Sequence, residues 1–132
     1  MLSDTHFHLS SILNRGIDIA ALLKQMSEKK FLFALDIGTE CDDFYKHKSV
    51  FENALKQLTE EEQKYIRSVY HFSCGIWPDE NAIEDRFNQC KILEKIVSDN
   101  FDEICALGEF GVDRHYNKNN VIEELELFSL QM

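Results

Sequence analysis

Apolar residues are distributed along the chain in a pattern that predicts four strands, each followed by helical sequence. The strands are expected at short apolar runs, in residues 2–7, 31–37, 68–74 and 102–107. The segments between them carry apolar residues three or four positions apart, which is the spacing of helices with one buried face. Because helical sequence separates each strand from the next, the strands are expected to be parallel. The pattern therefore predicts an α/β fold built from consecutive βα units.

Capping residues predict where several helices begin. Asp18 can cap a helix with apolar positions at Ile19, Leu22, Leu23 and Met26. Thr59 and Glu62 have the spacing of a capping box, and that short helix is expected to end near Tyr65. A long helix should start at residue 79 or 81, with a buried face made of Ile83, Phe87, Cys90, Leu93 and Val97. A last helix is expected from the spacing of Ile122, Leu125, Phe128 and Met132.

Two of the predicted strands have the character of fully buried strands. Residues 31–37 form a continuous apolar run, which is typical of a strand buried on both faces. Residues 104–107 form a shorter run of the same kind. Both are therefore expected to be buried strands.

Composition limits the class of protein. A chain of 132 residues, 44% hydrophobic and 29% charged, has room for one packed domain, residues 1–132. The net charge of -10 argues against nonspecific nucleic-acid binding through a basic surface, but not against a site where bound metal cations offset the charge. The four cysteines show no Cys-x-x-Cys pair and are interpreted as reduced core thiols. With no signal peptide and no apolar run of roughly 20 residues, a cytoplasmic protein without a membrane span is expected.

Candidate chemistry lies at the ends of the first and fourth predicted strands. His6 and His8 are two residues apart, so both imidazoles should leave the same face, roughly 6.6 Å apart at about 3.3 Å per residue. Glu109 follows the fourth strand between Gly108 and Gly111. Parallel α/β folds place their sites at the carboxyl ends of strands. The pattern is typical of a metal site, and the residues alone leave open the simpler interpretation of solvent-exposed imidazoles and a carboxylate in a turn.

These motifs resemble those of one enzyme family. The stretch Asp4-Thr5-His6-Phe7-His8-Leu9 is similar to the opening D-T-H-x-H-L of the TatD family of metal-dependent deoxyribonucleases. The stretch Gly108-Glu109-Phe110-Gly111-Val112-Asp113 is similar to that family's G-E-I-G-L-D segment. The chain departs from the family at Trp77, where the family's G-x-H-P motif has histidine, and at Arg114-His115-Tyr116, where an aromatic residue usually follows the aspartate.

The resemblance implies a fold, a reaction and a set of ligands. The fold would be a TIM-type barrel, and the reaction would be metal-dependent hydrolysis of phosphodiester bonds in DNA. His6 and His8 would bind the first of two divalent cations, and Glu109 would bridge both and serve as the catalytic carboxylate. The cations would be Mg²⁺, Mn²⁺ or Zn²⁺, since ligand type alone does not choose among them. Asp4, Asp113 and Arg114 are candidates for orienting a ligand or contacting substrate.

The resemblance covers only the family's first half, about half of a barrel. We therefore expect a truncated chain, one that pairs with a second copy, or one completed by a partner chain, with little or no activity alone. Four parallel strands leave open sheet edges. The alternative function is accordingly a non-enzymatic remnant or interaction module whose edges pair with a partner chain. A related hydrolase with another substrate is a further option.

Overall fold

The computed structural model of the chain describes residues 2–115 and 117–132. The chain forms two compact units. The first comprises residues 1–37 and 45–72, and the second comprises residues 38–44 and 73–132. One strand, β3 (Tyr70–Cys74), contributes Tyr70–Phe72 to the first unit and Ser73–Cys74 to the second.

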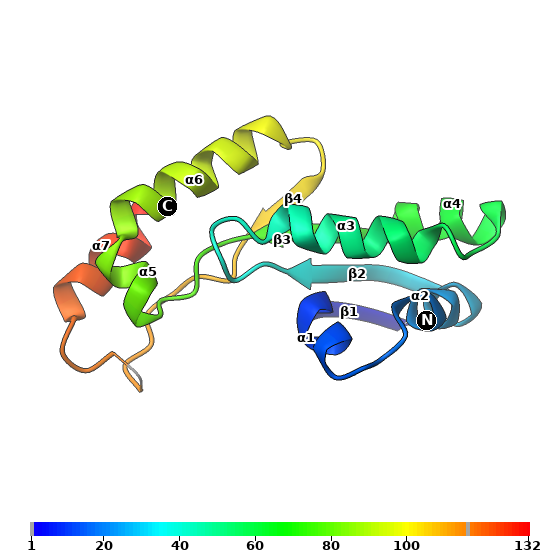
Figure 1. The fold of residues 1–132 in the computed structure, drawn as a ribbon, viewed down its shortest axis with the longest axis horizontal. Coiled ribbons are helices and arrows are strands. Elements are labelled where there is room, and N and C mark those ends of the chain that lie inside the picture. Colours follow the sequence, from blue (N-terminus) through cyan, green and yellow to red (C-terminus); the bar gives the residue numbers. More distant parts are fainter. Residues whose placement is uncertain (1, 116) are drawn as a thin grey trace. The chain divides into compact units, whose positions relative to one another are not determined.

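The first unit is built on two parallel strands. β1 (Leu2–Phe7) pairs with β2 (Phe31–Ile37), in a register that places Phe7 opposite Asp36. Figure 1 shows the two strands running side by side, β1 in blue and β2 in cyan. The helices of this unit are α1 (Leu9–Asn14), α2 (Ile19–Glu28), α3 (Phe44–Leu55), whose first residue belongs to the second unit, and α4 (Glu60–Val69).

Local signals determine where α2 and α4 begin. The Asp18 carboxylate accepts hydrogen bonds from the backbone N–H groups of Ala20 (2.9 Å) and Ala21 (3.2 Å), so the predicted cap of α2 is confirmed. Thr59 and Glu62 form the predicted capping box. α4 continues past Tyr65 to Val69, and β3 therefore begins at Tyr70 rather than at Ser68.

An aromatic cluster forms the core of the first unit. The Tyr70 ring stacks on Phe51 with centroids 4.2 Å apart and meets the edges of Phe7 and Phe72. All four side chains are buried. Edge-to-face and offset contacts between aromatic rings stabilise the fold in addition to the stability gained by burying apolar surface. They anchor β3 to both β1 and α3.

The second unit contains the last strand and three helices. Its elements are β4 (Ile104–Leu107), α5 (Glu80–Glu84), α6 (Arg86–Asp99) and α7 (Val121–Leu130). The Gly108 N–H donates to the Cys74 carbonyl at 2.7 Å, which joins the ends of β3 and β4. The expected long helix is divided at Asp85, which leaves the helical conformation and separates α5 from α6. Figure 1 shows α5, α6 and α7 grouped together.

The strands have the order β1-β2-β3-β4 and are parallel. The predicted α/β class is confirmed, and the succession of parallel βα units is consistent with half of a TIM-type barrel. In the described residues, none of the helices is both long and apolar enough to cross a membrane.

Several predictions of burial are wrong. Leu32 of β2 is 56% exposed and Leu107 of β4 is 43% exposed, so neither strand is buried on both faces. Phe87 of α6 is 55% exposed although it was expected on the buried face. In α7 the apolar residue Ile122 is 70% exposed, while the carboxylate Glu124 is fully buried. Apolar spacing identifies a helix correctly, but the neighbouring elements decide which side of it is covered.

Candidate active site

The two histidines of the first motif lie together in the first unit. Their rings meet edge to face, with centroids 5.1 Å apart and planes at 84°. Each ring offers a nitrogen within 4.8 Å of the other. His6 is exposed and His8 is half-buried. The side-by-side arrangement predicted from their spacing at the end of a strand is therefore present.

The end of β2 orients His8. Parallel pairing places this residue beside Ile37, and Nδ1 of His8 lies 3.0 Å from the Ile37 carbonyl oxygen. A carbonyl oxygen only accepts hydrogen bonds, so the ring proton is on Nδ1 in this contact. Nε2 then carries the lone pair that a metal ion requires, an arrangement common among metal-binding histidines.

A buried cluster supports the turn that follows His8. Asp36 is fully buried, and its Oδ1 accepts the backbone N–H of Leu9 at 2.9 Å. Its Oδ2 accepts hydrogen bonds from His47 Nδ1 and from the Tyr70 hydroxyl, both at 3.0 Å. A buried carboxylate is tolerated when it is hydrogen-bonded in this way. Sequence analysis missed this cluster. The one feature that could have indicated it is Asp36, a charged residue within the otherwise apolar strand β2.

The free energy of unfolding should decrease at alkaline pH, and replacing Tyr70 with Phe is expected to make that decrease smaller. Burial, and then the neighbouring Asp36 carboxylate, raise the pKa of Tyr70 well above its usual range. The unfolded chain releases this proton at about pH 10, whereas the folded chain retains it. The contribution of protonated Tyr70 to the free energy of unfolding is therefore fully present below about pH 10. It is lost as the pH rises further, by up to about 1.4 kcal/mol per pH unit.

The measurement is the free energy of unfolding in urea at a series of alkaline pH values. The Tyr70→Phe variant should show a smaller decrease than the unmodified chain, and Tyr45→Phe, at a residue 51% exposed, should follow the unmodified chain. Identical pH dependence in all three proteins would contradict the expectation.

Asp4 has a local role. Its Oδ1 accepts the backbone N–H of His6 at 3.0 Å, a bond across two residues on an exposed stretch. This bond is of the kind that short polar side chains make in turns. It restrains the backbone at His6 rather than the imidazole ring.

Within the second unit, glycines allow the backbone at Glu109 to approach Gly38 and the end of β3. The Glu109 N–H donates to the Gly38 carbonyl at 2.7 Å, and the Ser73 hydroxyl donates to the Gly108 carbonyl at 2.7 Å. A Cβ atom on Gly75 would lie 2.6 Å from the Gly108 carbonyl carbon, so only glycine permits this approach. Gly108 itself has a φ of 146°, which also favours glycine.

The buried carboxylate of Glu124 organises the loop that follows Glu109. Its Oε1 accepts hydrogen bonds from the Asp113 N–H (2.7 Å) and from the Asn117 amide (2.9 Å). Its Oε2 lies 2.8 Å from the Arg114 guanidinium. Arg114 therefore forms an ion pair with a buried carboxylate.

Asp113 and the rest of this loop have local contacts. The Asp113 carboxylate accepts the backbone N–H of His115 at 2.9 Å. Tyr116, one of the residues that departs from the family motif, lies outside the described residues. Sequence analysis missed the structural role of Glu124, because a glutamate in a helix is usually exposed.

The cysteines are poorly suited to act as nucleophiles. Burial, followed by the neighbouring Asp42 and Asp43, raises the pKa of Cys41 to about 11. Burial also raises the pKa values of Cys90 and Cys105. Only Cys74 is buried and Cys105 is exposed, so the expectation that all four are core thiols is wrong. Since the thiolate is the reactive form, the carboxylates and imidazoles remain the candidates for chemistry.

A comparison with protein families identifies the chain. Residues 3–132 match the family model for TatD related DNase. Comparison with curated proteins gave no match, and comparison with solved structures gave none either. The match extends from the first motif, through Glu109, to the end of α7. The chain therefore belongs to the TatD related DNase family.

Proposed function

We propose that this protein is a metal-dependent hydrolase that cleaves phosphodiester bonds in DNA. His6, His8 and Glu109 are proposed as the metal ligands, with Glu109 as the catalytic carboxylate. The observation that carries this proposal is the paired arrangement of His6 and His8, in a chain whose residues 3–132 match a family of DNases. His6 and His8 lie at the carboxyl end of β1 and Glu109 follows β4, and the carboxyl ends of parallel strands are where such folds place their sites.

The donor set suits a divalent cation. Two imidazole nitrogens bound to one ion at about 2.1 Å lie at most about 4.2 Å apart, and the His6 and His8 nitrogens are within 4.8 Å of each other. Mixed nitrogen and oxygen ligands accept Zn²⁺ and Mn²⁺, and Mg²⁺ is held more weakly by imidazole.

The chain's own residues would hold the reacting groups in position. The Ile37 carbonyl holds the His8 proton on Nδ1, so Nε2 would be the atom available to bind a cation. The Gly38 carbonyl and the close approach of Gly75 fix the backbone at Glu109. Divalent cations, when bound, would polarise the phosphodiester and lower the pKa of a bound water to about neutral. Two imidazoles and one carboxylate form an open site, so slow hydrolysis by the chain alone is expected.

The proposal is tested with a fluorescent DNA oligonucleotide in the presence of Mn²⁺, Mg²⁺ or Zn²⁺. We expect slow hydrolysis that ceases with chelator, and Glu109→Gln should lower its rate at least about tenfold, to the chelator background, because the amide cannot serve as a charged ligand. Glu103→Gln, at an exposed residue of the same unit, is the matched control and should retain the rate. Hydrolysis that persists in Glu109→Gln would contradict the assignment, and no hydrolysis with any cation would contradict the activity.

A further inference from the structure

Two acceptors at the end of β2 hold the turn that carries His8. The Ile37 carbonyl accepts the His8 Nδ1 proton at 3.0 Å, and Asp36 Oδ1 accepts the Leu9 N–H at 2.9 Å. The first bond restrains the imidazole ring, and the second restrains the backbone one residue later. All four residues belong to the first unit. The direction in which His8 presents Nε2 therefore depends on two adjacent residues of β2.

The Leu9 N–H is the first backbone donor of α1. The first N–H groups of a helix have no partner within that helix, so they need an acceptor from elsewhere. Leu9 is fully buried, and the side chain of His8, which precedes it, makes no capping hydrogen bond. Asp36 supplies the acceptor from 27 residues away in the sequence. Its carboxylate thus caps α1 from a different element.

Two donors in turn set the position of the Asp36 carboxylate. His47 of α3 donates from Nδ1 to Oδ2, and the Tyr70 hydroxyl of β3 donates to the same oxygen, both at 3.0 Å. All three residues are at most 5% exposed. A carboxylate only accepts hydrogen bonds, so His47 carries a proton on Nδ1. Because both donors hold Oδ2, Oδ1 stays directed at Leu9.

Stability alone gives a weak reason for a charged group at this place. Apolar side chains of similar volume can often replace a buried charged cluster with little loss of stability, or with a gain. An apolar side chain at residue 36 could not accept the Leu9 N–H, however, and the turn beside His8 would lose its restraint. Groups that orient a metal ligand typically contribute about 10- to 100-fold to metal affinity. The cluster therefore has the properties of a support for His8.

We infer that Asp36, His47 and Tyr70 are positioning residues for the metal ligand His8. They fix the turn at Leu9, and with it the hydrogen bond from His8 to the Ile37 carbonyl that leaves Nε2 available to a cation. The inference rests on the proposed function, which makes His8 a ligand. Loss of a donor to Asp36 Oδ2 should change the tautomer of His8 and weaken metal binding.

The first test uses the full chain without metal, labelled with ¹⁵N-histidine, at about pH 8, where an ordinary histidine is neutral. Nuclear magnetic resonance distinguishes the Nδ1–H from the Nε2–H tautomer, and the His8→Ala variant identifies the His8 signals. The unmodified chain should show the Nδ1–H form, and His47→Leu should show a mixture of both. His47→Asn, whose amide nitrogen can take the place of Nδ1, should restore the Nδ1–H form. An unchanged tautomer in His47→Leu, or the Nε2–H form in the unmodified chain, would overturn the inference.

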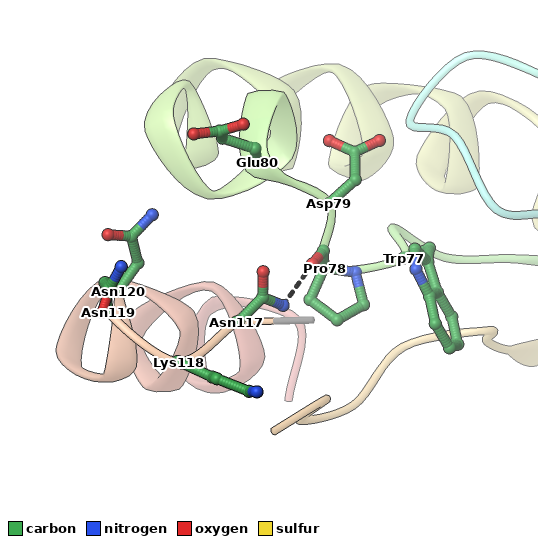
Figure 2. A pocket seen from close by; sticks show the side chains of 8 residues that line it. All are labelled: Trp77, Pro78, Asp79, Glu80, Asn117, Lys118, Asn119 and Asn120. Atoms are coloured by element: carbon green, nitrogen blue, oxygen red, sulfur yellow. Dashed lines mark hydrogen bonds between the residues drawn. The ribbon is translucent and has the colours of Figure 1, made fainter. Parts of the chain in front are cut away.

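Two control variants separate positioning from stability. Thr59→Ala removes the capping box of α4 in the same unit, and loss of such a cap lowers stability. Asn117→Leu removes one donor from the buried carboxylate of α7 in the second unit. Figure 2 shows its amide directed at its other partner, the Pro78 carbonyl. Both variants should lose stability in urea and keep the Nδ1–H form of His8. A change in either as large as that in His47→Leu would overturn the inference.

The second test is calorimetric titration with Mn²⁺ and Zn²⁺, after circular dichroism has established which variants fold. His47→Leu should weaken binding about tenfold, at the lower end of the range for groups that orient a metal ligand. Tyr70→Phe keeps its ring in the aromatic cluster and should weaken binding a few-fold, so it tests the inference even where His47→Leu does not fold. His47→Asn should restore the affinity, and Thr59→Ala should not change it. Unchanged affinity in the folded variants of His47 and Tyr70 would overturn the inference.

Failure of this inference can be distinguished from failure of the proposed function. The double variant His6→Ala with His8→Ala decides whether cations bind at the pair. If it weakens binding and His47→Leu does not, the inference alone fails. Equal binding by the double variant would refute the proposed site, and with it His8 as a metal ligand, even where the tautomer test succeeds.

Discussion

Replacing both His6 and His8 with alanine is expected to reduce the affinity for Mn²⁺ and Zn²⁺ at least about 100-fold. Loss of a residue that merely orients a metal ligand typically costs about 10- to 100-fold in affinity, and here two direct ligands are removed together. The two rings lie in edge contact and offer nitrogens within 4.8 Å of each other. Calorimetric titration of chelator-treated protein provides the measurement.

The matched control is the double variant His71→Ala with His115→Ala, which removes the same number of imidazoles. His71 stacks on Phe33 with centroids 4.8 Å apart, and His115 is exposed in the loop after Glu109. This control should bind as the unmodified chain does. Equal affinity in the His6 and His8 variant would show that cations bind elsewhere, and the proposed site would then have to be abandoned.

Replacing Asp36 with asparagine is expected to lower the free energy of unfolding by about 3 kcal/mol. The carboxylate is fully buried and accepts three hydrogen bonds, from Leu9, His47 and Tyr70. An amide of the same shape keeps one acceptor oxygen but turns an NH₂ group toward a donor, which leaves buried polar groups unpaired. Breaking a buried, hydrogen-bonded charge typically costs about 3–5 kcal/mol.

Urea denaturation monitored by circular dichroism measures this difference. Asp102→Asn is the matched control, because Asp102 is exposed and its replacement should change stability by less than about 0.5 kcal/mol. A loss below about 1 kcal/mol in Asp36→Asn would mean that the three hydrogen bonds contribute little, and that the turn after His8 is held by other contacts.

The arrangement of Arg114 changes how the loop after Glu109 is interpreted. A cation near a proposed phosphodiester site suggests a phosphate contact, yet this guanidinium lies 2.8 Å from a carboxylate that is fully buried. Glu124 also accepts the Asp113 N–H and the Asn117 amide. Arg114 and Asn117 therefore both contact Glu124, and through it they hold the loop that follows Glu109.

Sequence alone determined the features that depend on neighbouring residues. The strand of residues 2–7, the Asp18 cap and the Thr59–Glu62 capping box were all predicted with their observed bounds or partners. The parallel α/β class followed from the alternation of strands and helices, and the family followed from two short motifs. These properties are local because capping and strand periodicity involve residues within a few positions of each other.

Tertiary structure decided which side chains are buried and which polar groups meet. Asp36 accepts a hydrogen bond from Tyr70, which is 34 residues away in the sequence. Glu124 contacts Asp113 and Arg114, which lie at the other end of a loop. Apolar spacing could not reveal that Phe87 and Ile122 are exposed while Glu124 is fully buried. The physical reason is that burial and hydrogen-bond pairing depend on which elements pack together, and that depends on long-range contacts rather than on the residues of one element.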